Sequence, residues 1–200
     1  MSIAEKILLL KEDMDTVYEK GKEKAMQAFA DAYQDGGDRT NYYQAFIQIG
    51  WNDHSFSYIR HPILCKGDEV AATSVFSRCR MTRISVPVVI QGVIAREIFY
   101  YATALETIDD VTFLQVPEFR NLFAGCGKLK HIGIGGSIDV SFSVSASPEL
   151  DEETRQSIVV HLKDLTDLET QTLTLHKTVG EKLTAEQKAA ITAKNWTLVY

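Results

Sequence analysis

Apolar residues in the middle of the chain recur at matched positions with a period of about 24 residues. The pattern F-x-x-C-x-x-L-x-x-I-x-I describes residues 123–134, and residues 99–108 fit the same positions with Ala102 in place of the cysteine. A degraded copy covers residues 76–86 and is one residue short after Cys79. A fixed period of this size indicates stacked repeats, because one copy has too few apolar residues to bury its own face. The pattern therefore predicts an α/β solenoid.

The repeats occupy roughly residues 73–145, and each L-x-x-I-x-I segment is expected to form a short strand. Residues 84–90 alternate and then run apolar, as a strand leading into the next unit does. The pieces at 96–101 and 117–124 are expected to be short helices or turns on the convex side. Val140–Val144 alternates strictly between apolar and polar residues and predicts another strand.

Helix and strand signals then alternate to the end of the chain, which assigns 73–200 to one solenoid domain. Ser147 is the expected N-cap of a helix, with Pro148 at its first position. Gln171–Leu175 predicts a strand, and residues 179–183 predict a turn. Thr184 and Gln187 form a capping box that opens the last helix, and a strand from Trp196 follows. Such helix–strand pairs continue a parallel sheet, since parallel strands need crossover connections.

The N-terminal 35 residues predict an oligomerisation or docking helix. Its stripe of apolar residues alternates three and four apart, as in the seam of a coiled coil: Ile3, Ile7, Leu10, Met14 and Val17. Isoleucine at both stripe positions of the first heptad favours a homotrimer. The alternative is that this stripe packs against the rest of the same chain.

Residues 36–72 predict a helical and aromatic cap with a connector. Tyr42, Tyr43, Phe46 and Trp51 crowd a short segment, and a solenoid needs a cap where its end repeat would expose the core. An exposed aromatic recognition surface is the alternative.

Composition narrows the function classes. The net charge of −6 and an isoelectric point near 5.4 argue against a nucleic-acid partner, which needs a clustered basic face. The cysteines, Cys65, Cys79 and Cys126, are odd in number and suit buried packing better than a disulfide or a metal site. The N-terminal apolar run is too short for a signal peptide, and the sequence holds no membrane span.

Candidate chemistry is sparse. Asp109 and Asp110 follow a repeat strand at a turn, and the acids from Asp151 sit in a helix first turn, where the dipole favours them. We therefore predict no enzyme, cofactor or metal. A partner-binding face is expected where side chains project between the apolar strand positions of the repeats. Its residues are Arg83, Ser85, Thr107, Asp109 and His131, followed by Gly133 and, further along, Thr172 and Thr174.

The repeat resembles the BspA-like leucine-rich repeat, a class common on bacterial surfaces and in phage virions. Residues 183–198, following 171–175, are similar to the closing unit of such proteins in phages and prophages of gut Firmicutes. The stretch from Ala32 to Trp51 resembles their opening segment.

The resemblance implies a homo-oligomeric, non-enzymatic virion structural protein, assembled in the host cytoplasm with other virion proteins. Its expected place is a tail, baseplate or fibre, with host attachment through a surface protein or glycan. A bacterial cell-surface adhesin and a capsid-decorating head protein are the alternatives.

Overall fold

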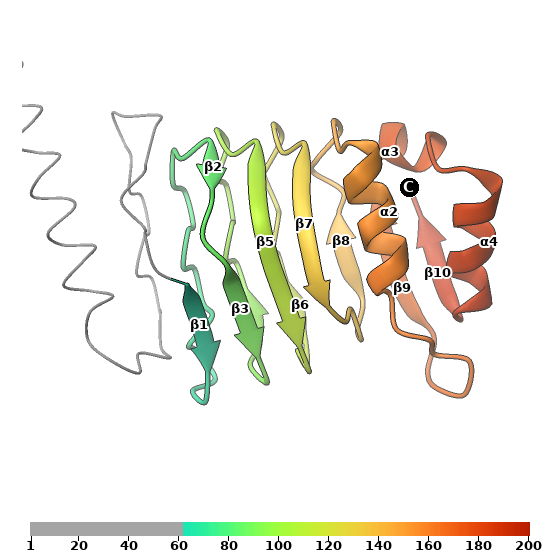
Figure 1. Ribbon diagram of the computed structural model, residues 1–200, viewed down its shortest axis with the longest axis horizontal. Helices are drawn as coiled ribbons and strands as arrows, with labels where there is room; N and C mark the ends of the chain where they lie inside the picture. Colours follow the sequence, from blue (N-terminus) through green and yellow to red (C-terminus); the bar gives the residue numbers. More distant parts are fainter. Residues whose placement is uncertain (1–61) are drawn as a thin grey trace, which may run out of the picture. The chain divides into compact units, whose positions relative to one another are not determined.

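The computed structural model describes residues 62–200, which form a mixed α/β domain built on parallel sheets (Figure 1). The strands are β1 (Ile63–Lys66), β2 (Arg83–Ile84), β3 (Val88–Gln91), β4 (Ala95–Arg96), β5 (Thr107–Leu114), β6 (Phe119–Arg120), β7 (His131–Gly136), β8 (Phe142–Val144), β9 (Gln171–Leu175) and β10 (Trp196–Val199). The helices are α2 (Glu152–His161), α3 (Lys177–Glu181) and α4 (Ala185–Ala193).

The largest sheet joins equivalent strands of successive repeats. Strand β1 pairs with β3, β3 and β2 pair with β5, and β5 pairs with β7, all in parallel. Ile84 lies opposite Ile108, and Ile108 lies opposite Ile132, so neighbours across the sheet are 24 residues apart in the chain. The predicted strands at the L-x-x-I-x-I segments are confirmed.

The segments predicted as short helices or turns, 96–101 and 117–124, contain turns, and each also holds part or all of a two-residue strand. β4 pairs in parallel with β6, and Thr73 forms a bridge with Arg96. Turns follow each of these strands, and the same left-handed backbone conformation recurs just before each repeat phenylalanine. It falls at Ser74, Glu97 and Asn121, with φ of 54°, 54° and 51°. The turn alternative is confirmed and the helix alternative is wrong, because neighbouring copies hydrogen-bond to one another there, as Glu97 N–H does to the carbonyl of Arg120 at 2.8 Å.

The phenylalanines of the repeat form a stack in the core. The ring centroids of Phe76 and Phe99 are 5.6 Å apart and those of Phe99 and Phe123 are 5.3 Å apart, with planes within 3° and 2° of parallel. These rings are at most 1% exposed. The cysteine position of the repeat is equally buried, so Cys79 and Cys126 pack as expected from the sequence.

Beyond β7 a helix takes the place of the next strand. α2 packs against β7, and the Thr154 hydroxyl accepts a hydrogen bond from the Ile132 backbone at 2.9 Å. The Asp151 N–H donates to the carbonyl of Lys130 at 2.8 Å. The helix thereby satisfies backbone groups at an edge of the sheet that would otherwise offer a pairing surface. The remaining strands, β8, β9 and β10, form a separate parallel sheet (Figure 1).

Two local predictions in this half need correction. Asp151, rather than Ser147, is the N-cap of α2, because its carboxylate accepts from Thr154 N–H at 2.8 Å. Ser147 is buried and donates its hydroxyl to the carbonyl of Cys126 at 3.1 Å. The segment predicted as a turn at 179–183 overlaps the short helix α3. The capping box of Thr184 and Gln187 is confirmed, as are the strands from Gln171 and Trp196.

The end of α4 is tied to the end of α2 by one lysine. The ammonium of Lys194 donates to the carbonyls of Val159, Val160 and Leu162 at 2.9, 3.0 and 2.7 Å. These carbonyls lie at the C-terminus of α2, where a cation is favoured by the helix dipole. Partial burial lowers the pKa of Lys194, and the charge of Asp164 opposes that shift.

The predicted N-terminal helix lies outside the described residues, as does the predicted aromatic cap from residue 36 to residue 61. The oligomerisation stripe (Ile3, Ile7, Leu10, Met14 and Val17) therefore stays a prediction, and so do the domain boundaries at 35 and 72.

The buried thiols should make stability fall at high pH. Burial raises the pKa of Cys65, Cys79 and Cys126 from 9.0 to about 12. The folded state holds these thiols protonated, so their full contribution is present below pH 9 and is lost as the pH rises from about 9 towards 12. Ala102 shows that alanine fits the same repeat position, which makes Cys126→Ala a conservative test.

We expect wild type to lose stability above about pH 9 more steeply than Cys126→Ala, by at most about 1.4 kcal/mol per pH unit for the one thiol removed. Urea unfolding at a series of pH values measures both slopes. Equal slopes would show that Cys126 ionises freely in the folded protein.

Candidate functional site

The predicted partner-binding face is assembled by strand register. Arg83 of β2 lies opposite Thr107 of β5, and Thr107 lies opposite His131 of β7. These side chains alternate with the buried isoleucines, so they project from the outer side of the sheet. The structure therefore brings Arg83, Thr107, Asp109 and His131 together, and Ser85 is exposed two residues beyond Arg83.

We call the surface formed by Arg83, Ser85, Thr107, Asp109 and His131 the strand face; on it, a bidentate ion pair joins adjacent repeats. The Nε of Arg83 lies 3.0 Å from both carboxylate oxygens of Asp109, and its Nη2 lies 2.8 Å from Oδ2. Hydrogen bonding and the charge of Asp109 raise the pKa of Arg83. The arginine side chain is still 65% exposed, so the pair fixes the position of a guanidinium that a partner can reach.

His131 connects the strand face to α2. Its Nδ1 lies 3.0 Å from Oδ2 of Asp151. Partial burial opposes ionisation of Asp151, but hydrogen bonds from Thr154 and His131 outweigh it, and the pKa of Asp151 is lowered. The imidazole is 25% exposed. His131 is thus oriented by Asp151 and stays partly accessible to solvent.

A β-bulge in β5 shapes the middle of the strand face. The register shifts between Ile108 and Val111, so Asp109 and Asp110 together lie opposite Gly133 of β7. Bulges of this kind bend a strand and re-aim its side chains. Here the bulge places the Asp109 carboxylate beside Arg83, while Asp110 accepts a hydrogen bond from the Thr112 hydroxyl at 3.1 Å.

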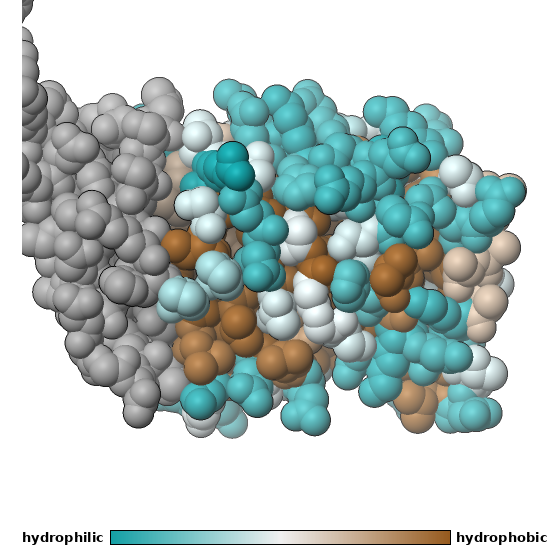
Figure 2. Space-filling view, viewed as in Figure 1, coloured by the Kyte–Doolittle hydropathy of each residue, from teal (hydrophilic) through white to brown (hydrophobic). Residues whose placement is uncertain are grey.

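Hydrophilic residues surround α2, which also exposes the apolar Val160, and an apolar area extends over β1 and β3 (Figure 2). Leu64 and Val89, which are neighbours in register and half-buried, lie on those two strands.

Within residues 62–200 no three His, Cys, Asp or Glu side chains gather as a metal site would need. The helices of that part of the chain are too short or too polar to cross a membrane.

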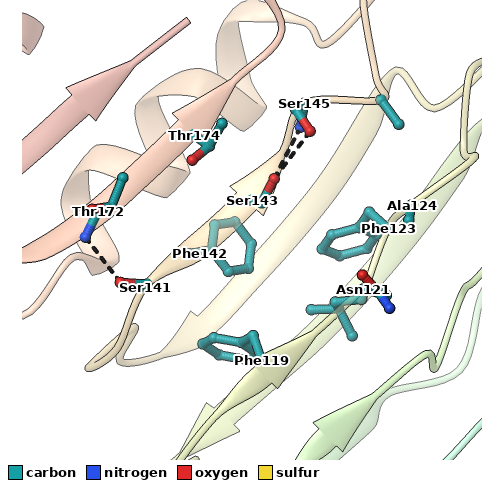
Figure 3. A pocket seen from close by; sticks show the side chains of 12 residues that line it. Phe119, Asn121, Phe123, Ala124, Ser141, Phe142, Ser143, Ser145, Thr172 and Thr174 are labelled. Atoms are coloured by element: carbon teal, nitrogen blue, oxygen red, sulfur yellow. Dashed lines mark hydrogen bonds between the residues drawn. The ribbon is translucent and has the colours of Figure 1, made fainter.

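A second candidate site is a pocket of about 330 Å³ between β6 and β8 (Figure 3). The two-stranded sheet of β4 and β6 ends at this pocket, because β8 does not join it. Strand β8 pairs with β9 in the three-stranded sheet. Aromatic rings pack beneath the pocket: the centroid of Phe142 lies 5.3 Å from that of Phe119 and 5.9 Å from that of Phe123. Serine and threonine side chains of β8 and β9 line the other side.

Thr172 and Thr174 belong to this pocket rather than to the strand face on which the sequence placed them. Both lie on β9, in a different sheet from β2, β5 and β7. The alternation of Ser141, Ser143 and Ser145 with apolar residues is the signal that places hydroxyls on one side of β8. No local sequence pattern predicts the pocket itself, because the pocket depends on where the sheet of β4 and β6 ends and the sheet of β8, β9 and β10 begins.

Comparisons of the whole chain with protein-family models, curated proteins and solved structures find no match in any of the three. The repeat pattern, the strand face and the pocket therefore carry the functional argument.

Gly133 should be essential to the bulge and hence to the strand face. A Cβ added to Gly133 would overlap the carbonyl oxygen of Asp109, which is backbone and unable to move aside. At Gly127 an added Cβ would meet only the carbonyl oxygen of Ala146 at 4.0 Å. We expect Gly133→Ala to lower the free energy of unfolding by about 2 kcal/mol or more and Gly127→Ala to change it by less than about 0.5 kcal/mol.

Urea unfolding of both variants checks this expectation. If the two glycines tolerate alanine equally well, the close approach of β7 to the bulge is not present in solution.

Proposed function

We propose that residues 73–200 form a leucine-rich-repeat solenoid of the BspA-like kind and that the chain is a non-enzymatic structural protein of a phage virion. One observation carries the first half of the proposal. Matched positions of successive copies, such as Thr107 and His131, lie side by side in parallel register while their phenylalanines stack inside. Side-by-side stacking of successive copies is what a solenoid requires, and it supports this half of the proposal.

The strand face supports a binding role over a catalytic one. Charged groups on it and beside it pair with each other: Arg83 with Asp109 on the face, and Glu106 with Lys130, at 2.9 Å, just before β5 and β7. Paired surface charges hold a defined pattern of donors and acceptors, which suits recognition of a protein partner. Hydrogen bonding and charge from Lys130 lower the pKa of Glu106, so that carboxylate is held in its ionised form.

The virion assignment rests on the sequence resemblance. In this proposal the N-terminal helix makes a trimer, docks on other virion proteins and carries the solenoid outward as a tail, baseplate or fibre component that contributes to host attachment. An oligomer multiplies weak contacts, since each further contact then forms at a high effective concentration.

The oligomer is tested by the mass of the purified full-length chain in solution, measured by light scattering. We expect a trimer for wild type and a monomer for the variant Ile7→Asp, Leu10→Asp, because carboxylates cannot be buried in a coiled-coil seam without a large penalty.

The chain offers a matched control in Leu8→Asp, Leu9→Asp, which adds the same charges off the predicted stripe and should remain a trimer. A monomeric wild type contradicts the stem. Dissociation by both variants would show that the stripe is not the interface.

Virion location is tested by density-gradient fractionation of particles produced by cells that encode the chain. The chain should co-sediment with assembled particles and be detectable in them by mass spectrometry. Recovery in the cell envelope alone would favour the adhesin alternative.

A further inference from the structure

We propose that the pocket between β6 and β8 binds a neutral saccharide unit. This site is separate from the strand face and from the N-terminal stripe on which the proposed function rests, so either proposal can fail alone. The pocket is built by elements of two of the three sheets: β6, of the two-stranded sheet, and the turn after it on one side, and β8 and β9, of the three-stranded sheet, on the other (Figure 3).

The pocket lies where the phenylalanine stack ends, at Phe123. The next ring, Phe142, lies at 78° to Phe123 and also meets Phe119 at 79°. A perpendicular ring does not continue a stack of parallel planes, and at the same place β8 pairs with β9 rather than with β6. The space left open measures about 330 Å³, which lies at the lower end of the range of roughly 300–1,000 Å³ for small-ligand pockets. One sugar ring, rather than a long ligand, fits that volume.

The lining selects for a neutral ligand. None of the side chains that form the pocket carries a charge. A phosphate, a carboxylate or an ammonium group would lose its hydration there without gaining an ionic partner, which is costly. The ligand therefore needs hydrogen-bonding groups without a net charge.

The geometry also offers the two kinds of contact that a sugar ring makes. Phe119 is partly exposed and lines the pocket, and the negative face of an aromatic ring attracts the weakly positive C–H groups on one face of a pyranose. Hydroxyls stand at alternate positions of β8 and β9, where Ser143 lies opposite Thr174. Hydroxyls of this kind can both donate to and accept from the hydroxyls at the edge of a sugar.

Several of these polar groups are available to a ligand. Within residues 62–200, the hydroxyls of Thr172 and Thr174 and the side-chain amide of Asn121 make no hydrogen bond to the protein. Ser141, by contrast, is already engaged: its hydroxyl donates to Gln171 at 2.8 Å and accepts from the Thr172 backbone at 3.0 Å. Both threonines lie on strand β9 and are only partly exposed, so the sheet holds their side chains in place. Binding to groups held in this way costs less conformational entropy than binding to groups on a flexible loop.

The test uses saturation-transfer NMR on the full-length chain with the methyl glycosides of glucose, galactose, mannose and N-acetylglucosamine. We expect at least one glycoside to receive saturation, with its ring C–H protons nearest the protein. Binding should be constant from about pH 5 to pH 8, because no lining group titrates in that range.

The decisive variant is Thr172→Val, Thr174→Val, which removes both hydroxyls and keeps the β-branched shape that strands favour. We expect it to weaken binding about tenfold or more. The matched control is Thr197→Val, at an exposed position of the edge strand β10, opposite Thr172 in register but outside the pocket lining. This control should bind as wild type does. Circular dichroism and the solution mass should be unchanged in both variants, since neither touches the predicted oligomer stripe.

The proposal is overturned if no glycoside receives saturation from the folded wild type. It is equally overturned if the pocket variant, folded and of wild-type mass, binds as strongly as Thr197→Val.

Discussion

Face-to-face packing of Phe76, Phe99 and Phe123 is the constraint on which the rest of the described structure depends. Centroid separations of 5.6 and 5.3 Å are close to the spacing of roughly 4.7–4.9 Å between hydrogen-bonded strands. One ring per repeat can therefore stack only if the neighbouring strands stay in register. The stack and the backbone ladder reinforce each other, and each holds the buried isoleucines of the sheet in line.

The two candidate sites follow from how that order is kept and where it ends. Where register holds, outward residues of successive strands form the strand face, and the bulge opposite Gly133 brings Asp109 to Arg83. Beyond Phe123 the next ring, Phe142, is perpendicular to the stack, and the pocket lies beside these two rings. α2 then covers the edge of β7, and the chain continues as helix and strand. One proposed binding surface is thus the regular strand face, and the other is the pocket at the point where the regular stacking ends.

Much of this fold was predictable from sequence because its signals are local or periodic. The spacing of Ile84, Ile108 and Ile132 gave the paired strands, and the Thr184 capping box gave the start of α4. The bulge at Asp109 and the pocket were not predictable, because each depends on how distant strands pair. Likewise, Asp151 displaced Ser147 as the cap of α2 because Ser147 is buried against Cys126, a contact between residues 21 apart.

Replacement of the central ring of the stack tests this account most directly. Urea unfolding of Phe99→Ala should show a loss of about 3–5 kcal/mol, the cost of emptying a fully packed aromatic position. Leu168→Ala, at a side chain that is 55% exposed, is the reference and should change stability by less than about 0.5 kcal/mol. If Phe99→Ala costs no more than Leu168→Ala, the stack does not hold the repeats in register.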